Sequence, residues 1–303
     1  MNTVSTVEKK YYYSEIFYSI QGEGHYTGVP TAWLRFFLCN LQCNGFGQLD
    51  PTNPDTYELP FEDFDVTTVK RVEDLPVWEK GCDSSYTWAK KFKGLMGQET
   101  PSALANKLVD AIKTDSNPTG QFLHPITKQR QHLCFTGGEP LMATGQMAVV
   151  GIWEELARQG NLPGSMTFET NGTQIIRPKF IDWVNSIDTE VFFSCSPKLF
   201  TVSGEKADKA IKPEIVVEYY KLSKAGQLKF VVGPKQREWD EMEEAVEKFR
   251  EAGVEWPVWI MPTGAREQEQ HASAGDVAQK AFQRGYNVAA RVHVYLFGNK
   301  IGT

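Results

Sequence analysis

Two cysteines separated by three residues follow an apolar run near the start of the chain. Cys39 and Cys43 come directly after residues 31–38, a run of apolar and aromatic side chains that is interrupted by Arg35. Thiolates are soft ligands, so this pair suits zinc or an iron–sulfur cluster, and a third thiolate would leave one coordination position open. Free cysteine is also a common buried residue, so two core thiols are the alternative interpretation.

Cys82 is the candidate for the third ligand because it opens a short polar motif, Cys82-Asp83-Ser84, directly after a glycine. Cys134 lies in the middle of a predicted strand and Cys195 at the end of another, so we expect both to be structural. An odd number of cysteines, five in all, at irregular spacing fits a reducing compartment better than a disulfide framework.

A glycine-rich loop precedes the cysteines. Residues 19–24 read SIQGEG and carry the amide of Gln21 and the carboxylate of Glu23. The glycines allow the backbone to bend tightly and to approach a ligand closely. Together with Arg35, this stretch places an amide, a carboxylate and a guanidinium close together in the sequence.

Three more polar motifs follow predicted strands: GGEP at residues 137–140, ETNG at 169–172 and SPK at 196–198. Taken singly, the first two are explained as turns and Lys198 as a solvated surface lysine. Their chemistry also fits a binding site, because paired glycines expose backbone groups, Glu139 offers a carboxylate to an amine, and Glu169 suits ribose hydroxyls. His293 alternates with apolar residues, as a buried core histidine does.

Strands and helices in alternation position these motifs. The patterns predict strands at residues 11–20, 31–38, 132–136, 165–169, 190–195, 227–232, 257–261 and 288–296, and helices at residues 101–113, 141–158, 178–186, 213–224, 237–252 and 274–284. Ser102 is the predicted N-cap of the first helix. Such alternation implies crossover connections and a parallel sheet. We therefore predict an α/β fold whose polar motifs meet at the C-terminal edge of the sheet, where ligands of such folds bind.

Length and composition limit the possible classes of protein. With 303 residues, 41% of them hydrophobic and 23% charged, the chain is expected to form one globular domain, with or without insertions. A net charge of −6 argues against a broad nucleic-acid-binding surface. The absence of a signal-peptide core and of a run of about 18 apolar residues predicts neither export nor a membrane span. Residues 44–81 show no period, which is typical of a functional loop or of an insertion packed by its own side chains.

Taken together and in order, the motifs resemble those of one enzyme family. SIQGEG, an arginine-bearing strand, CNLxC, a CD dipeptide, TGGEP, ETNGT, SPK, QLKFVV and a histidine near the C-terminus are similar to the 7-carboxy-7-deazaguanine synthase (QueE) family of radical S-adenosylmethionine enzymes. The resemblance covers residues 12–43, 82–88 and, in patches, 132–303. It implies an incomplete (β/α) barrel with parallel strands, formed by a single radical-SAM domain over residues 1–303, with residues 44–81 as an insertion in the cluster-binding loop.

The resemblance implies a radical carbon–nitrogen lyase. Family members hold a [4Fe–4S] cluster through three cysteines and bind S-adenosylmethionine at the remaining iron. A 5′-deoxyadenosyl radical abstracts hydrogen from 6-carboxy-5,6,7,8-tetrahydropterin, and the ring contracts with loss of ammonia to 7-carboxy-7-deazaguanine, which enters 7-deazaguanine (queuosine-type) biosynthesis for tRNA or DNA. The family also implies Mg²⁺, an electron donor such as a flavodoxin, a homodimer and a cytoplasmic location, with no direct nucleic-acid or membrane partner.

Site residues follow from the resemblance motif by motif. The substrate would be contacted by Gln21, Glu23, Arg35, Thr136 and His293, with the arginine suited to a carboxylate and Glu23 to a pterin edge. The S-adenosylmethionine site would contain Gly138, Glu139, Glu169, Ser196, Lys198 and Gln227. The metal ligands would be Cys39, Cys43 and Cys82 for the cluster, and Ser84, which stands in place of the threonine of a CDT motif, for Mg²⁺.

The chain departs from the family at the third cysteine. In the family pattern CxxxCxxC, that position corresponds to Phe46, which cannot ligate iron, and the Cys-Asp pair returns only at Cys82. Because the cost of loop closure grows only logarithmically with length, an insertion displaces the third ligand without preventing cluster binding. Two alternatives stay open: a radical-SAM enzyme with an altered substrate, and a clusterless pterin-binding relative. The insertion either covers the cluster or docks a reductase.

Overall fold

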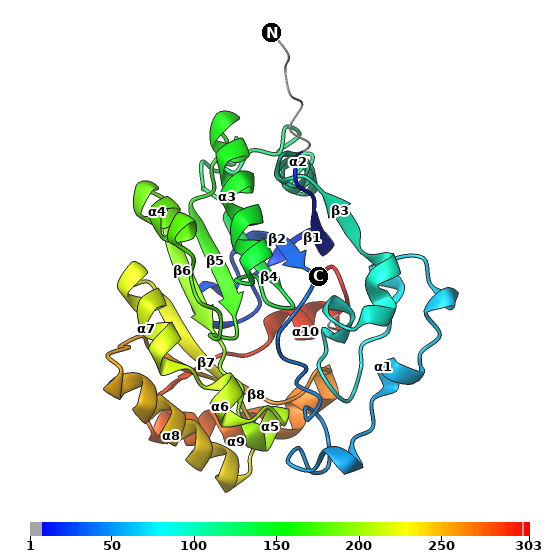
Figure 1. Cartoon of the computed structure of the whole chain (residues 1–303), viewed down its shortest axis with the longest axis vertical. Helices are drawn as coiled ribbons and strands as arrows, with labels where there is room; N and C mark the ends of the chain where they lie inside the picture. The colour runs from blue at the N-terminus through cyan, green and yellow to red at the C-terminus, as the bar shows by residue number, and fades with distance from the viewer. Residues whose placement is uncertain (1–7, 299) are drawn as a thin grey trace.

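A curved sheet forms the centre of the protein, whose structure is a computed structural model (Figure 1). Residues 8–298 and 300–303, which the structure describes, contain nine strands in the order β3-β1-β2-β4-β5-β6-β7-β8-β9. The strands are β1 (Tyr11–Ile20), β2 (Pro30–Phe36), β3 (Gly97–Glu99), β4 (His132–Gly137), β5 (Ser165–Thr170), β6 (Glu190–Cys195), β7 (Gly226–Val232), β8 (Val258–Pro262) and β9 (Asn287–Val288).

The sheet is parallel from β2 to β9, as the alternation of strands and helices predicted. The N-terminal strand β1 differs, because it pairs antiparallel with both β2 and β3. A short loop joins β1 to β2, and only antiparallel neighbours can be joined by so short a connection. Since β3 and β9 stand at opposite ends of the strand order, the sheet is open, and the α/β fold is an incomplete (β/α) barrel.

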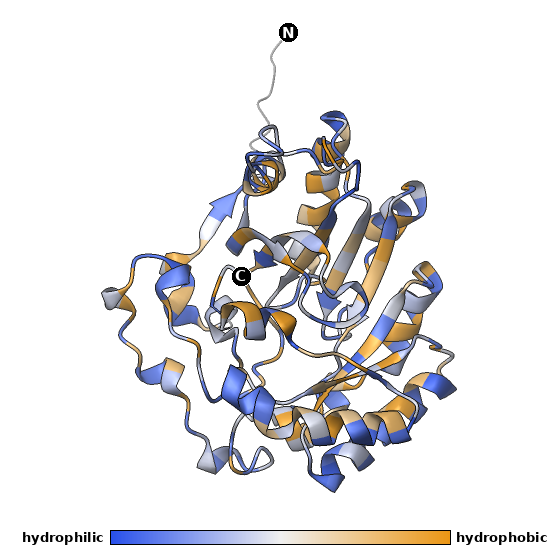
Figure 2. Cartoon of the chain, turned by 180° about the vertical axis from the view of Figure 1, so that it is seen from behind, coloured by the Kyte–Doolittle hydropathy of each residue, from blue (hydrophilic) through white to orange (hydrophobic). Residues whose placement is uncertain are grey.

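Helices surround this sheet, and most of them cover its outer face (Figure 1). They are α1 (Pro60–Asp63), α2 (Pro101–Ala111), α3 (Ala143–Arg158), α4 (Pro178–Ser186), α5 (Phe200–Ser203), α6 (Ala207–Ala210), α7 (Pro213–Leu222), α8 (Gln236–Glu251), α9 (Glu267–Gln283) and α10 (Val292–Phe297). Figure 2 shows apolar stretches along the strands and alternating apolar and polar stretches along the helices, as expected of helices that bury one face. None of the helices in the described ranges has the length and apolar character needed to cross a membrane.

Aromatic side chains fill the space between the sheet and its helices. Phe135, Phe168 and Phe193 lie side by side on β4, β5 and β6, with ring centroids 5.4 and 5.7 Å apart. Phe180 of α4 packs on the second ring and Tyr219 of α7 on the third. This outer row is buried, so the residues that alternate with it along each strand must point to the opposite, inner face.

Three sequence predictions differ from the structure. The side chain of Thr100, not Ser102, caps α2 by accepting a hydrogen bond from the backbone of Ala103, because Pro101 occupies the first helical position. Helix α9 begins at Glu267, before the predicted start at residue 274. The carboxylate of Glu269 caps this end by accepting hydrogen bonds from the backbone N–H groups of Ala265 and Arg266. The predicted last strand, residues 288–296, is wrong.

That last segment contains the two-residue strand β9 followed by helix α10, so His293 lies on a helix. The run RVHVYLF is too short for its period to distinguish a strand from a helix. The backbone N–H of Val292 donates to the carbonyl of Gly22 at 2.9 Å, so the start of α10 is tied to the glycine-rich loop.

Residues 44–81 form an irregular segment with short helical turns, among them α1. The apolar side chains Phe61, Val72, Leu75 and Trp78 form a small cluster with Phe92, separate from the main core. This packing explains how a segment without periodicity is ordered, while its origin as an insertion stays a prediction.

Candidate functional site

The inner face of the sheet carries a row of polar side chains. Thr136, Glu169 and Ser194 each follow one of the outer phenylalanines by one residue and therefore point inward, and Arg35 occupies the corresponding place on β2. These four residues line a cavity of about 640 Å³ at the C-terminal ends of the parallel strands. Its volume lies in the range expected for a small-molecule site.

The cavity collects most of the residues that the motifs indicated. The predicted site residues that line it are Gln21, Glu23, Arg35, Cys39, Cys43, Cys82, Ser84, Thr136, Gly138, Glu169, Ser196, Lys198 and His293. Glu139 and Gln227 do not line it and lie buried behind it. Val77, Glu79 and Lys80 of the insertion also line the cavity, so the insertion forms part of its wall.

Arg35 and Glu169 form the floor of the cavity. The Nε of Arg35 donates to Glu15 Oε1 at 2.6 Å, and the hydroxyl of Tyr86 donates to the same oxygen at 2.9 Å, which fixes the guanidinium in place. Glu169 accepts hydrogen bonds from the amide of Gln21 at 3.2 Å and from the hydroxyl of Thr136 at 2.9 Å. An oriented guanidinium and an oriented carboxylate can together bind a planar ligand that carries both acidic and N–H groups.

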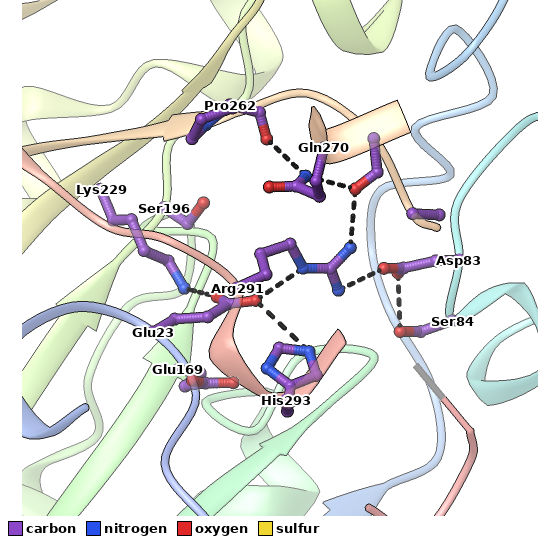
Figure 3. A network of polar contacts seen from close by, with 12 residues as sticks. Glu23, Asp83, Ser84, Glu169, Ser196, Lys229, Pro262, Gln270, Arg291 and His293 are labelled. Atoms are coloured by element: carbon purple, nitrogen blue, oxygen red, sulfur yellow. Dashed lines mark hydrogen bonds and ion pairs between the residues drawn. The ribbon is translucent and has the colours of Figure 1, made fainter. Parts of the chain in front are cut away.

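Glu23 is the centre of a network of charges (Figure 3). Lys229 donates to Glu23 Oε2, Arg291 Nε lies 3.0 Å from Oε1, and the imidazole of His293 lies 3.9 Å from the same oxygen. Burial alone would raise the pKa of Glu23, but Lys229 and Arg291 hold it well below its ordinary value. Glu23 is therefore an ionised hydrogen-bond acceptor inside the cavity. Burial lowers the pKa of His293, which favours a neutral imidazole there.

The three candidate metal-ligating cysteines lie near one another at another part of the cavity wall. Cys43 packs with Leu41 and Ala210, and Cys39 and Cys82 pack against the same small cluster. Burial raises the pKa of Cys39 to about 12 and that of Cys82 to about 11, and it raises the pKa of Cys43 well above its ordinary value. The thiols are therefore protonated in the metal-free chain, and metal binding would release their protons.

The base of the insertion explains how Cys82 reaches the other two cysteines. The backbone N–H of Gly81 donates to the carbonyl of Phe46 at 2.8 Å, so the chain leaves and returns at the same place. Gly47 has φ +68°, and a Cβ there would lie 2.4 Å from the carbonyl oxygen of Glu79, so only glycine allows the two segments to pass so closely. Cys82 thereby stands beside Phe46, the position at which the third cysteine was missing.

Glu139 joins two of the motifs. Its carboxylate accepts hydrogen bonds from the backbone of Leu141 at 2.9 Å, the hydroxyl of Thr170 at 2.8 Å and the backbone of Asn171 at 2.7 Å. Burial raises its pKa to about 7, and the three donors oppose this shift. These contacts tie the loop after β4 to the loop after β5, and they leave its neighbour Gly138 to line the cavity.

Gln227 packs against the glycine-rich loop and supports it. Its side-chain oxygen accepts a hydrogen bond from the backbone of His25 at 3.1 Å, and its amide donates to Ser194 Oγ at 2.8 Å. A Cβ on Gly24 would lie 2.3 Å from the Gln227 amide nitrogen, so the loop packs directly on this side chain. These contacts position the loop, and a direct contact of Gln227 with S-adenosylmethionine stays a prediction.

Comparison with known proteins supports the resemblance drawn from the motifs. No family model matches the chain. Six curated proteins match it significantly, and all are named 7-carboxy-7-deazaguanine synthase. The protein from Rhodopirellula baltica is 25% identical over 96% of this chain and 88% of its own length, and that from Pyrobaculum aerophilum is 27% identical over 95% of each. The chain is a relative of the 7-carboxy-7-deazaguanine synthases.

The resemblance that the motifs indicated is thus confirmed, and the names of the similar proteins agree with the classification as an enzyme. A crystal structure of QueE from Escherichia coli aligns with 94% of this chain and 95% of that chain, at a TM-score of 0.48 and 17% identity. That degree of likeness is too low to carry an argument of its own.

The cysteines fit the cluster that such relatives imply in type and in number. No three His, Cys, Asp or Glu side chains in the described part of the chain are already arranged around a metal-ion position. All five cysteines are free, and the backbone N–H of Leu41 and the amide of Asn171 lie 3.4 and 3.9 Å from the sulfur of Cys39. Such donors stabilise a thiolate that ligates a metal.

The surroundings of Ser84 do not fit Mg²⁺ as well. Ser84 Oγ donates to Asp83 Oδ1 at 3.0 Å, while Asp83 Oδ2 is paired with Arg291 at the same distance. The nearby carboxylate of Glu23 is paired with Lys229 and Arg291. Because protein cations already neutralise both carboxylates, we derive no step from Mg²⁺.

The residues that the sequence analysis did not assign to the site include Lys229, Arg291 and Asp83, which line the cavity. They also include Glu205, which accepts hydrogen bonds from the backbone of the cysteine loop at Gln42 and Cys43. Lys229 stands two positions after Gln227 on the inward face of β7, in the quoted QLKFVV motif, and a lysine in so apolar a run was a usable signal. Asp83 lies within the quoted Cys-Asp pair. No pattern in the sequence indicated Arg291 or Glu205, because their partners lie far away in the chain.

Proposed function

We propose that this protein is a 7-carboxy-7-deazaguanine synthase, which converts 6-carboxy-5,6,7,8-tetrahydropterin to 7-carboxy-7-deazaguanine with loss of ammonia. The observation that carries the proposal is the hydrogen bond between Gly81 and Phe46, which returns Cys82 to Cys39 and Cys43 beside a cavity lined by the substrate motifs. The names of the near-full-length relatives support the same activity.

In this proposal the chain's own residues bind and orient the pterin. Arg35, held by Glu15, would pair with the substrate carboxylate, and the ionised Glu23 would accept hydrogen bonds from the N–H edge of the ring. Gln21 and Thr136, both joined to Glu169, would contact the ring, with His293 beside Glu23 as a neutral donor or acceptor.

The cofactor would lie between the pterin and the cysteines. A [4Fe–4S] cluster with S-adenosylmethionine supplies a 5′-deoxyadenosyl radical when bound. Gly138 exposes backbone groups to the amino acid part, and Lys198, which donates to Ser196 Oγ at 3.0 Å and interacts with all three thiols, supplies a positive charge for its carboxylate. Glu169 would accept hydrogen bonds from the ribose hydroxyls, while Glu139 would hold the loop of Gly138 in place.

Anaerobic reconstitution of the whole chain with iron and sulfide tests this proposal. We expect about four irons and four sulfides per chain, and turnover of 6-carboxytetrahydropterin with S-adenosylmethionine to a product that has the mass and absorbance of a deazapurine. Cys82→Ala should lose both the iron and the turnover. Cys134→Ala, at a buried position in β4 outside the cavity lining, is the matched control and should keep the iron.

The outcome also separates the alternatives. A chain that takes up no iron would be a clusterless relative, and one that binds the cluster but leaves this pterin unchanged would have another substrate. Residues 1–303 as one domain with an insertion at 44–81, a flavodoxin-type donor, a homodimer and a cytosolic location stay predictions of this proposal. The proposal does not include Mg²⁺ at Ser84, because the carboxylates nearby are already paired. A role of the insertion in covering the cavity is supported by Val77, Glu79 and Lys80 in its wall.

A further inference from the structure

Arg291 joins two parts of the site that are far apart in the sequence. Its Nε lies 3.0 Å from Glu23 Oε1, its Nη2 lies 3.0 Å from Asp83 Oδ2, and its Nη1 donates to the carbonyl of Gly264 at 3.1 Å. The side chain is 10% exposed and lines the cavity (Figure 3). All three nitrogens of the guanidinium are thus used, and its orientation is fixed by the fold.

Its first partner, Asp83, follows directly after Cys82. In a CxxxCxxC loop the distance from the second to the third cysteine is limited by a few residues of backbone, but here residues 44–81 intervene. Tertiary contacts must therefore fix the place of Cys82. The backbone contacts are those of Gly81 with Phe46 and of Leu38 with Thr87, the latter at 2.7 Å. The ion pair between Asp83 and Arg291 adds a buried side-chain contact right next to the thiol.

Its second partner, Glu23, belongs to the substrate loop. Glu23 and Asp83 are two carboxylates on the same cavity, and their mutual interaction is unfavourable. One guanidinium between them attracts both carboxylates and sets their separation, since its planar fork can bind two acceptors at fixed angles. A lysine at this position presents a point charge and can satisfy only one of the two carboxylates fully.

The backbone around Arg291 is held independently of its side chain. The N–H of Val292 donates to Gly22 O, and a Cβ on Gly22 would lie 1.9 Å from Nδ1 of His293, so α10 is packed closely on the glycine-rich loop. We therefore expect α10 to stay docked when the guanidinium is removed. Its removal would then change the positions of Glu23 and Asp83 without unfolding the segment that carries it.

We propose that Arg291 is a positioning residue that holds the third cluster thiol, Cys82, and the substrate-binding carboxylate, Glu23, at a fixed separation. This inference rests on the proposed function. In this way the chain can tolerate an insertion inside the cluster loop. The contact of Arg291 with Asp83 replaces the short backbone connection that would otherwise place Cys82, and the same arginine orients the loop that carries Glu23.

Arg291→Gln, Arg291→Lys and Asp83→Ala, with Arg266→Gln as the control, test the proposal. Arg266 is matched because it is also an arginine paired with the insertion, at 2.8 Å from Glu79, and it does not line the cavity. Each variant is reconstituted anaerobically. The rate at which a chelator removes iron and the KM and kcat for 6-carboxytetrahydropterin are measured, and near-ultraviolet circular dichroism monitors the fold.

Arg291→Gln should raise both the rate of iron loss and the KM by about tenfold, since one charge-assisted contact is lost with Asp83 and one with Glu23. Asp83→Ala should lose iron at a rate similar to that of Arg291→Gln but keep the KM of the unmodified chain. Arg291→Lys should bring either the rate of iron loss or the KM part of the way back to the value of the unmodified chain. Arg266→Gln should behave as the unmodified chain. A purely structural arginine would instead change iron loss and KM in proportion in both the Arg291 and the Asp83 variants.

The proposal is overturned if an active, folded Arg291→Gln chain keeps both the iron-loss rate and the KM of the unmodified protein. If that variant does not fold, Asp83→Ala decides, because a rise in KM as large as its rise in the rate of iron loss contradicts the division of roles. An unmodified chain that takes up no iron refutes the proposed function and, with it, this inference. If the unmodified chain is active and the Arg291 variants have its iron-loss rate and its KM, only this inference is refuted.

Discussion

Replacing Glu205 by alanine should destabilise the loop that carries two of the cysteines. Glu205 Oε1 accepts hydrogen bonds from the backbone N–H groups of Gln42 at 2.6 Å and of Cys43 at 2.9 Å. Its other oxygen pairs with Lys209 at 2.9 Å. The carboxylate therefore satisfies two backbone donors in a loop where Cys43 adopts φ +53°, a conformation that residues other than glycine rarely take.

The magnitude follows from the surroundings of each donor. The N–H of Cys43 belongs to a buried residue, and leaving such a donor unpaired costs about 1–3 kcal/mol. Gln42 is exposed, so water can replace its lost partner and the cost is about 0.5–1.5 kcal/mol. The ion pair with the half-exposed Lys209 contributes less than about 1 kcal/mol. We expect Glu205→Ala to lower the free energy of unfolding by about 2–4 kcal/mol.

Glu205→Gln is the matched control. Its amide oxygen can still accept both backbone hydrogen bonds, so it should lose under about 1 kcal/mol, mostly the ion pair. Burial alone would raise the pKa of Glu205, but the N–H of Cys43 and the contact with Lys209 hold it below its ordinary value. A depressed pKa gives stability that is present at neutral pH and is lost as the pH falls through the folded-state value. The difference between the unmodified chain and Glu205→Ala should therefore shrink in acid.

Urea unfolding of the metal-free, reduced proteins at pH 7 and at pH 4, followed by tryptophan fluorescence, measures these differences. Limited proteolysis provides a local readout, because a loosened loop over residues 39–46 should be cut faster in Glu205→Ala than in Glu205→Gln. If alanine and glutamine lower stability equally, the two backbone hydrogen bonds do not contribute as argued. If neither variant differs from the unmodified chain, the assignment of Glu205 as the anchor of the cysteine loop is refuted.

Two further perturbations test the same architecture. Gly47→Ala should open the base of the insertion and lower iron uptake, because its Cβ would meet the carbonyl of Glu79; Gly160→Ala, at a similar φ of +66° with nothing within 4 Å, is the control. Burial raises the pKa of Glu139 to about 7 from 4.5, so the metal-free protein should lose up to about 3 kcal/mol of stability as the pH rises across that interval. Urea midpoints at pH 5 and 8 should converge in Glu139→Gln, and an unchanged pH dependence would contradict the assignment.

The sequence predicted the parallel part of the fold because each strand is bounded by turn residues and followed by a helix of clear period. Strands β1 and β6 and helix α4 have the predicted bounds, and strands β2, β4, β5, β7 and β8 differ from the prediction by a few residues at most. The three-residue strand β3 was not predicted. Side-chain alternation along β4 and β5 is what turns this fold into a site, since Phe135 and Phe168 pack outward while Thr136 and Glu169 face the cavity.

The end of the chain shows where pattern analysis failed. His293 alternates with apolar residues, and six residues satisfy the period of a strand as well as that of a short helix. The hydrogen bond from the backbone of Val292 to that of Gly22 holds this segment in place, and the two residues are far apart in the sequence. Local propensity carries no information about such a partner, so neither α10 nor the role of Arg291 could be predicted.

Glu139 and Gln227 illustrate a second limit of prediction from sequence motifs. Their motifs indicated the right region, but the side chains act behind the cavity wall, where they bind backbone groups of neighbouring loops. A carboxylate or amide in a glycine-rich turn has two uses, toward a ligand or toward the turn itself, and composition does not distinguish them. The three donors around Glu139 decide the question, because they come from two different loops.

The predicted insertion at residues 44–81 raises the question of how the third cysteine keeps its place. A chain can lengthen a cluster loop without losing the third ligand only if the two ends of the inserted segment meet and the returning thiol is held from outside the loop. Gly81 and Phe46 satisfy the first condition, and Asp83 with Arg291 satisfies the second. Since the internal cluster around Phe61 gives the segment its own packing, its length has little effect on the geometry at its base. We therefore expect the position of Cys82 to depend on these contacts more than on the sequence of the segment that precedes it.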